Sequence, residues 1–134
     1  MIFVIIEDSH WDKKVVDGEA CPQARTQHAA IMTPKKEIFI FGGHASPVKR
    51  LNDCWLLKIA NPNNSEVQWE RIEGCDDVPD NEHSKIGAPG PRANMGATYY
   101  ENKIYIYGGH GGVGYARSAY ADIFSFDLET HTWH

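Results

Sequence analysis

The chain has 134 residues, a formal net charge of −5 and an ordinary composition, with 42% hydrophobic and 23% charged residues. The negative charge argues against a general affinity for nucleic acid, and no apolar run approaches the ~20 residues that a membrane-spanning helix needs. The cysteines are odd in number and form no Cys-x-x-Cys motif, which favours a reducing cytoplasmic compartment over a disulfide-stabilised secreted fold.

In chain order, the first predicted elements are a short strand over 2–6 and a tryptophan, Trp11. Four further strands are predicted over 27–32, over 37–41, after Asp53 and from Trp69 onward. The same series returns over 95–100, over 103–107, after Asp122 and from Trp133. Aromatic and β-branched residues dominate these segments, and Gly, Pro, Asn and Asp fill the gaps between them. No segment has an apolar period suited to a helix.

Landmark residues show that these strands belong to a repeat. Residues 39–44 read FIFGGH, and residues 105–110 read YIYGGH. An arginine precedes each glycine pair, an aspartate that opens an apolar run follows it, and a tryptophan closes the series. The landmarks are Arg25, Gly42, Gly43, Asp53 and Trp69 in one copy, and Arg92, Gly108, Gly109, Asp122 and Trp133 in the other. Four short antiparallel strands repeated in tandem indicate an all-β protein built of β-propeller blades.

The order of arginine, strand ending in Gly-Gly, aspartate and tryptophan resembles the kelch repeat. The resemblance covers nearly the whole chain. It divides the chain into the end of a preceding blade and a linker (1–24), a blade (25–74), an acidic loop rich in Pro and Gly (75–91) and a blade whose last strand is incomplete (92–134). It departs from the kelch pattern where that pattern favours a tyrosine before the tryptophan, since Val4, Leu57 and Phe126 stand there. Propellers have ~4–8 blades, so we expect further blades in a longer chain or in an oligomer.

The glycine pairs and tryptophans are expected to be structural, the glycines for a close turn and the tryptophans for blade packing. His44 and His110 follow the glycines in matching places, but blade repetition is expected to spread equivalent residues around a ring. No spacing typical of metal ligands and no nucleophile or phosphate-binding motif is present. We therefore predict no catalytic residue, no cofactor and no metal site. The alternative is part of a galactose-oxidase-like copper enzyme, because that enzyme is a kelch propeller, although none of its ligands can be matched here.

Strand direction places the longest connections on one face of the blades. These are 44–52, 72–91 and 110–121, whereas the tight turns 33–36 and 101–102 lie on the other face. Loops on a rigid scaffold commonly carry function, and arginine and tyrosine are enriched at binding hot spots. The candidate partner-binding residues are Lys49, Arg50, Tyr115, Arg117 and Tyr120, with Asp76 and Asp77 from the acidic cluster beside them. Arg25 and Arg92 are expected to brace the blades.

These residues predict a protein–protein interaction module, a scaffold or adaptor, rather than an enzyme. Because arginine offers a planar fork for carboxylates and phosphates, an acidic or phosphorylated peptide is the expected ligand. The kelch resemblance implies that this face holds peptide motifs of partner proteins. It also implies roles such as ubiquitin-ligase adaptor, cytoskeletal or ciliary scaffold, or regulator of another enzyme. A cytoplasmic location is expected, with nuclear or cytoskeletal association as alternatives.

Overall fold

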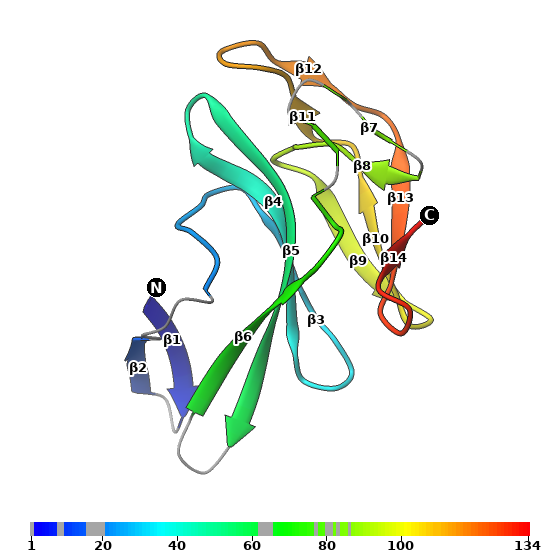
Figure 1. Ribbon diagram of the computed structural model, residues 1–134. Helices are drawn as coiled ribbons and strands as arrows, with labels where there is room; N and C mark the ends of the chain where they lie inside the picture. Colours follow the sequence, from blue (N-terminus) through cyan, green and yellow to red (C-terminus); the bar gives the residue numbers. More distant parts are fainter. Residues whose placement is uncertain are drawn as a thin grey trace.

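The computed structural model describes residues 2–7, 10–15, 21–61, 66–76, 78–79, 82, 84–85 and 87–134. These residues form two four-stranded antiparallel sheets and three two-stranded pairs (Figure 1). This part of the chain contains no helix that is long and apolar enough to cross a membrane. The predicted all-β fold of antiparallel four-stranded blades is confirmed.

The first four-stranded sheet, called the first blade here, has the order β3-β4-β5-β6. Its strands are β3 (Ala29–Met32), β4 (Ile38–Ser46), β5 (Lys49–Asn61) and β6 (Glu66–Ile72). Neighbours in the sheet are also neighbours in the chain, and each pair is antiparallel. The sheet is therefore a simple meander, which needs only short connections.

The second blade has the order β9-β10-β13-β14. Its strands are β9 (Gly96–Tyr100), β10 (Lys103–Tyr107), β13 (Ile123–Asp127) and β14 (Thr132–Trp133). Between β10 and β13 the chain makes a separate small pair, β11 (His110–Gly111) with β12 (Ser118–Ala119). The remaining pairs are β1 (Ile2–Glu7) with β2 (His10–Val15), and β7 (Ser84–Lys85) with β8 (Ala88–Pro89).

One predicted boundary is wrong. Residues 44–52 were expected to be a loop, but β4 continues to Ser46 and β5 begins at Lys49, leaving a two-residue turn. The pairing register shifts between Phe41 and Gly43 and again between His44 and Ser46. Such bulges bend a strand without ending its pairing, so the two strands extend past the glycine pair as a hairpin.

Alternation along the strands builds the core between the two blades. Phe39 and Phe41 of β4 are fully buried, and they point toward the second blade. The ring centroid of Phe39 lies 5.1 Å from that of Phe126, and that of Phe41 lies 5.0 Å from that of Trp133. On the other face of the first blade, Trp69 packs edge-on against Trp55. Both landmark tryptophans therefore stand in apolar packing.

The matching face of the second blade is open. Tyr105 and Tyr107 hold the places of Phe39 and Phe41, and Tyr107 is 58% exposed. Ile123, the cross-strand partner of Tyr107, is also exposed. The same sheet face is thus apolar and covered in one blade, and hydroxyl-bearing and uncovered in the other.

The second glycine of each pair stands where the chain leaves no room for a side chain. Gly43 has φ +99° and Gly109 has φ +87°, in a region that L-residues rarely adopt. A Cβ would lie 2.7 Å from the carbonyl oxygen of Thr26 at Gly43, and 2.8 Å from that of Ala93 at Gly109. The Gly43 N–H donates to the carbonyl of Arg92 at 2.9 Å, so this turn also joins the blades.

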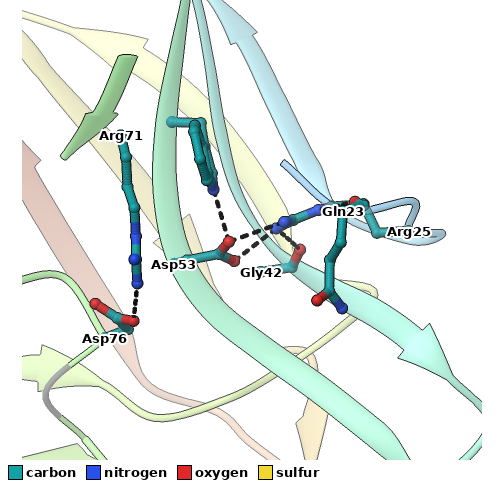
Figure 2. Close-up of polar contacts among 7 residues, drawn as sticks. Gln23, Arg25, Gly42, Asp53, Arg71 and Asp76 are labelled. Carbon is teal, nitrogen blue, oxygen red and sulfur yellow. Dashed lines mark hydrogen bonds and ion pairs between the residues drawn. The ribbon is translucent and has the colours of Figure 1, made fainter. Parts of the chain in front are cut away.

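Each landmark arginine forms a fork with the landmark aspartate of its own blade. Nη1 and Nη2 of Arg25 donate to the two carboxylate oxygens of Asp53 at 2.6 and 2.8 Å, and Nη1 also reaches the carbonyl of Gly42 (Figure 2). Trp55 Nε1 donates to the same carboxylate. Burial opposes ionisation of Asp53, but the bonds from Arg25 and Trp55 and the charge of Arg25 outweigh it and lower the pKa of the carboxyl.

The second blade repeats this arrangement. The fully buried Arg92 donates to Asp122 at 2.7 and 3.2 Å and to the carbonyl of Gly108 at 3.2 Å. Its guanidinium also lies over the rings of Tyr120 and Phe124, at 4.6 and 5.1 Å from their centroids. Arg25 thus ties the glycine turn of its blade to β5, which contains Asp53, and Arg92 ties its turn to the start of β13, which follows Asp122.

The glycine geometry predicts a large cost for one added methyl group. We expect Gly43→Ala to lower the free energy of unfolding by about 2 kcal/mol or more, because it combines an unfavourable φ with a backbone clash. Gly96→Ala is the matched control, since its Cβ would meet nothing closer than 4.0 Å. Urea unfolding measures the free energy of unfolding of both variants. Equal losses in Gly43→Ala and Gly96→Ala would show that Gly43 has no special structural role.

The ion pair predicts a second stability effect. We expect Asp53→Asn to lower the free energy of unfolding by about 2–4 kcal/mol, because it leaves the buried guanidinium of Arg25 without its counter-charge. Lys58→Ala, which removes the exposed pair with Glu70, should cost less than about 1 kcal/mol.

The same pair predicts an acid dependence. The folded pKa of Asp53 lies below its ordinary value of 3.8, so its contribution is present above that value. It is lost as the pH falls through the folded pKa. Unfolding curves below pH 4 should therefore depend less steeply on pH in Asp53→Asn than in the unchanged protein, and identical slopes would argue against the pair.

Candidate partner-binding site

Two chain segments gather at one end of the two blades. The tip of the β4–β5 hairpin and the β11–β12 pair lie at the same end in Figure 1, and the turns 33–36 and 101–102 lie at the opposite end. We call this end the loop face and define it as residues 44–50 and 110–120. It contains most of the predicted binding residues.

Arg50 is not the exposed loop side chain that was predicted. It lies at the start of β5 and is only 3% exposed. Its Nη1 donates to the carbonyl oxygens of Gly112 at 2.7 Å and Gly114 at 3.0 Å. Arg50 therefore ties the hairpin of the first blade to the loop of the second, and a large part of its role is to position that loop.

One edge of the Arg50 guanidinium is unused. Nε and Nη2 are buried and have no hydrogen-bond partner among the described residues, and no described carboxylate pairs with Arg50. Nε–H and Nη2–H point in the same direction and form the planar fork that accepts a carboxylate or phosphate with two hydrogen bonds. A buried donor pair without an acceptor is costly, so an acceptor bound at this edge would be stabilising.

The two histidines of the repeated motif touch. His44 Nε2 and His110 Nε2 are 3.1 Å apart, and their ring centroids are 5.2 Å apart. The expectation that the repeat would keep them apart is therefore wrong. Both follow the glycine turn close to the innermost strands, β3 and β9, which lie against each other. Residues at matching positions of the two blades, such as His44 and His110, come closest to one another at this inner edge.

Positive charge concentrates around this contact. His44 is the direct cross-strand partner of Arg50. Burial first, and then the charges of His44, Arg50 and Arg117, lower the pKa of His110. A metal cation would meet the same repulsion, and among the described residues no three His, Cys, Asp or Glu side chains come together as ligands. The electrostatics of the cluster favour an anion.

A cleft opens beside the cluster. Its volume is about 530 Å³, and it lies between the segment before β3 and the hairpin tip. Its lining residues are Ala24, Arg25, Thr26, Gln27, His44, Ala45, Ser46, Pro47 and Arg117. The cleft is wide enough for a peptide side chain, and its charged lining is cationic apart from the neutralised Arg25–Asp53 pair.

The other predicted binding residues divide into two groups. Lys49, Tyr115 and Arg117 are exposed on the loop face, Tyr115 at 84%. Tyr120 turns inward and packs on Arg92, so it supports the fold instead of facing a ligand. Asp76 pairs with Arg71 beside the face, and Asp77 lies outside the described residues. Arg50 and Arg117 thus both act on His110, whereas Tyr120 packs on Arg92.

Sequence reasoning did not assign His44 and His110 to a common site. The signal was present, because the same residue followed the same turn in both copies. What the sequence could not show is how closely the inner edges of neighbouring blades approach each other.

Comparison with known families gives a match along the whole chain. The family model for the KLHDC2/KLHL20/DRC7 Kelch-repeats domain matches residues 1–134. The glycine pairs, the arginine–aspartate forks and the four-stranded sheets described above all lie inside this match.

Individual relatives are much longer proteins. The chain is 33% identical over 110 residues to the dynein alpha chain of the flagellar outer arm of Chlamydomonas reinhardtii, covering 81% of this chain and 2% of that protein. It is 30% identical over 126 residues to tip elongation aberrant protein 3 of Schizosaccharomyces pombe, covering 84% of this chain and 11% of that protein. It is also 35% identical over 69 residues to tRNA wybutosine-synthesizing protein 4 of Gibberella zeae, covering 52% of this chain and 6% of that protein.

The charge cluster predicts a pH dependence of stability. Burial and neighbouring positive charges lower the pKa of His110, and burial and Arg25 lower that of His28. The unfolded chain therefore binds more protons than the folded protein just below pH 6.5, so stability should fall as the pH is lowered from 7.5 to 5.5. In His110→Gln the denaturation midpoint should depend less on pH over this range. An unchanged dependence would show that His110 contributes nothing to it.

Proposed function

The chain belongs to the kelch-repeat family, and we propose that it is a protein-interaction module whose loop face binds an acidic or phosphorylated segment of a partner protein. The observation that carries this proposal is the unused Nε–Nη2 edge of the buried Arg50. A guanidinium removed from water without a counter-charge is unfavourable, and a bound carboxylate or phosphate would supply both the charge and two acceptors.

The surroundings of Arg50 support the same ligand. Nη1 is held by two loop carbonyls, so the unused edge is fixed in direction before a ligand arrives. A pre-organised donor pair binds more tightly than a mobile one, because less side-chain entropy is lost. Arg117, which lines the cleft, and the exposed Tyr115 would then contact the flanking residues of the peptide.

The acidic residues beside the face would contribute selectivity. Asp76 and Glu82 are exposed, and Asp76 is joined to Arg71. Negative charges next to a cationic cleft repel peptides with long acidic runs and attract peptides with a basic flank. A single anionic group followed by basic residues is therefore the segment that this surface fits.

The cellular role is proposed from the relatives. The names of two of them refer to a flagellar dynein and to tip elongation. We infer a scaffold or adaptor role in the cytoplasm, associated with the cytoskeleton or cilia. The chain spans only 2–11% of these relatives, so their own activities are not transferred to it. Further blades, from a longer chain or an oligomer, would cover the open face of the second blade.

A peptide array tests the ligand class. One position is varied among Glu, phosphoserine, Gln and Lys in peptides that are otherwise identical, and binding of the labelled protein is measured. We expect the Glu or phosphoserine peptides to bind more tightly than the Gln and Lys peptides. Equal binding of the four sets would contradict the proposal.

Variants at the two ends of the blades test the location. We expect Arg50→Lys combined with Arg117→Ala to cost about 2–4 kcal/mol of binding, because lysine keeps a donor for the loop but loses the fork. The control is Lys35→Ala, which removes one positive charge at the opposite end. If the control loses binding and the double variant keeps it, the binding site lies at the end of the 33–36 turn and not on the loop face.

A further inference from the structure

The contact between His44 and His110 has a defined proton arrangement. His44 Nδ1 lies 3.3 Å from the carbonyl oxygen of Ser46, which can only accept, so Nδ1 carries the hydrogen. Nε2 of a neutral His44 is then an acceptor, and the 3.1 Å contact requires His110 Nε2–H to donate to it. This assignment follows from the hydrogen-bond network.

The pair can take up one proton without breaking this contact. The proton goes to Nδ1 of His110, whose Nε2–H continues to donate to His44. A charged donor strengthens such a bond. His110 is therefore the residue of the pair that takes up the proton.

Positive charges from both blades act on His110. Arg50 and Arg117 act directly on His110. Arg25 and Arg92 are each matched by an aspartate. Arg50 is the cross-strand partner of His44, and Arg25 and Arg117 line the cleft beside His44. Arg50 and Arg117 are the charges near the pair that no described carboxylate neutralises.

We propose that anion binding at the loop face is proton-linked, with His110 of the histidine pair taking up one proton when an anion binds the unused, buried edge of Arg50. Burial and neighbouring positive charges both lower the pKa of His110, and the anion offsets the effect of the charges. The protonated His110 in turn adds attraction for the anion. This inference rests on the proposed function for the source of the natural anion, but the linkage concerns any carboxylate, sulfate or phosphate group.

The direction and limit of the effect follow from linkage. Uptake of one proton makes the affinity for the anion rise as the pH falls, by at most tenfold per pH unit. The effect is confined to the pH range between the titration midpoint of His110 in the anion-free protein and its midpoint in the anion-bound protein. A partner would therefore be held more tightly at pH 6 than at pH 7.5, without any change in its own charge.

Inorganic sulfate is a suitable probe, because it stays a dianion throughout this range. The experiment follows the ring resonances of His110 by NMR from pH 5 to 8, in sulfate and in chloride at equal ionic strength. We expect sulfate to raise the titration midpoint of His110 by at least about 0.5 pH unit. His28, which lies near Arg25, is the internal control and should shift less.

Variants separate linkage from general screening. Arg50→Lys should abolish most of the sulfate-induced shift, because the fork is lost while the charge is kept. His44→Gln supplies an amide acceptor for His110 and cannot titrate, so the shift should persist in it. An unchanged midpoint in sulfate, or an equal shift in Arg50→Lys, would overturn the inference. Failure of acidic peptides on the array would overturn the proposed function alone, because the sulfate effect does not depend on a peptide.

Discussion

The bidentate pairing of one arginine with one aspartate in each blade is the constraint on which the rest of the structure depends. Arg25 and Arg92 each bind the carboxylate of their own blade and the carbonyl of the first glycine in the turn. The backbone of Arg92 also bonds to Gly43 and Leu51 of the neighbouring blade, at 2.9 and 3.1 Å. One residue therefore fixes a turn, a strand and the contact between sheets. The hairpin that holds Arg50 leaves the first blade at this turn, so the position of the candidate site follows from the fork.

The architecture could be predicted from the sequence because it depends on local and repeated signals. Gly-Gly after an aromatic strand, an aspartate before an apolar run and a closing tryptophan each have a physical reason to stand where they do, and they occur twice. The extension of β4 and β5 beyond Gly43 could not be predicted in this way. It depends on two register shifts, and bulges leave no clear trace in the pattern of apolar residues.

The candidate site was predictable in composition but not in geometry. Strand direction predicts that Arg50, Tyr115 and Arg117 lie at one end of the blades. Arg50 begins β5 beside the hairpin tip, and Tyr115 and Arg117 lie between β11 and β12, two segments at the same end in Figure 1. Arg50 is held by the backbone carbonyls of Gly112 and Gly114, which belong to the other blade. Backbone acceptors at glycines leave no recognisable pattern in the sequence. The contact between His44 and His110 likewise depends on how closely two inner edges approach. Long-range distances of this kind are set by the packing of whole sheets.

The exchange of Phe39 and Phe41 for Tyr105 and Tyr107 makes the two blades non-equivalent as building units. The phenylalanine face is sealed by Ile104, Ile106 and Phe126 of the next sheet, which offer no hydrogen-bond acceptor from their side chains. A tyrosine hydroxyl pressed against such a surface would lose its water without compensation, at a cost of about 1–3 kcal/mol for each ring. Stacking the sheets in the reverse order, with the tyrosine face pressed against an apolar sheet, is disfavoured for the same reason. The hydroxyl groups of Tyr105 and Tyr107 therefore favour one stacking order of the two sheets over the reverse order.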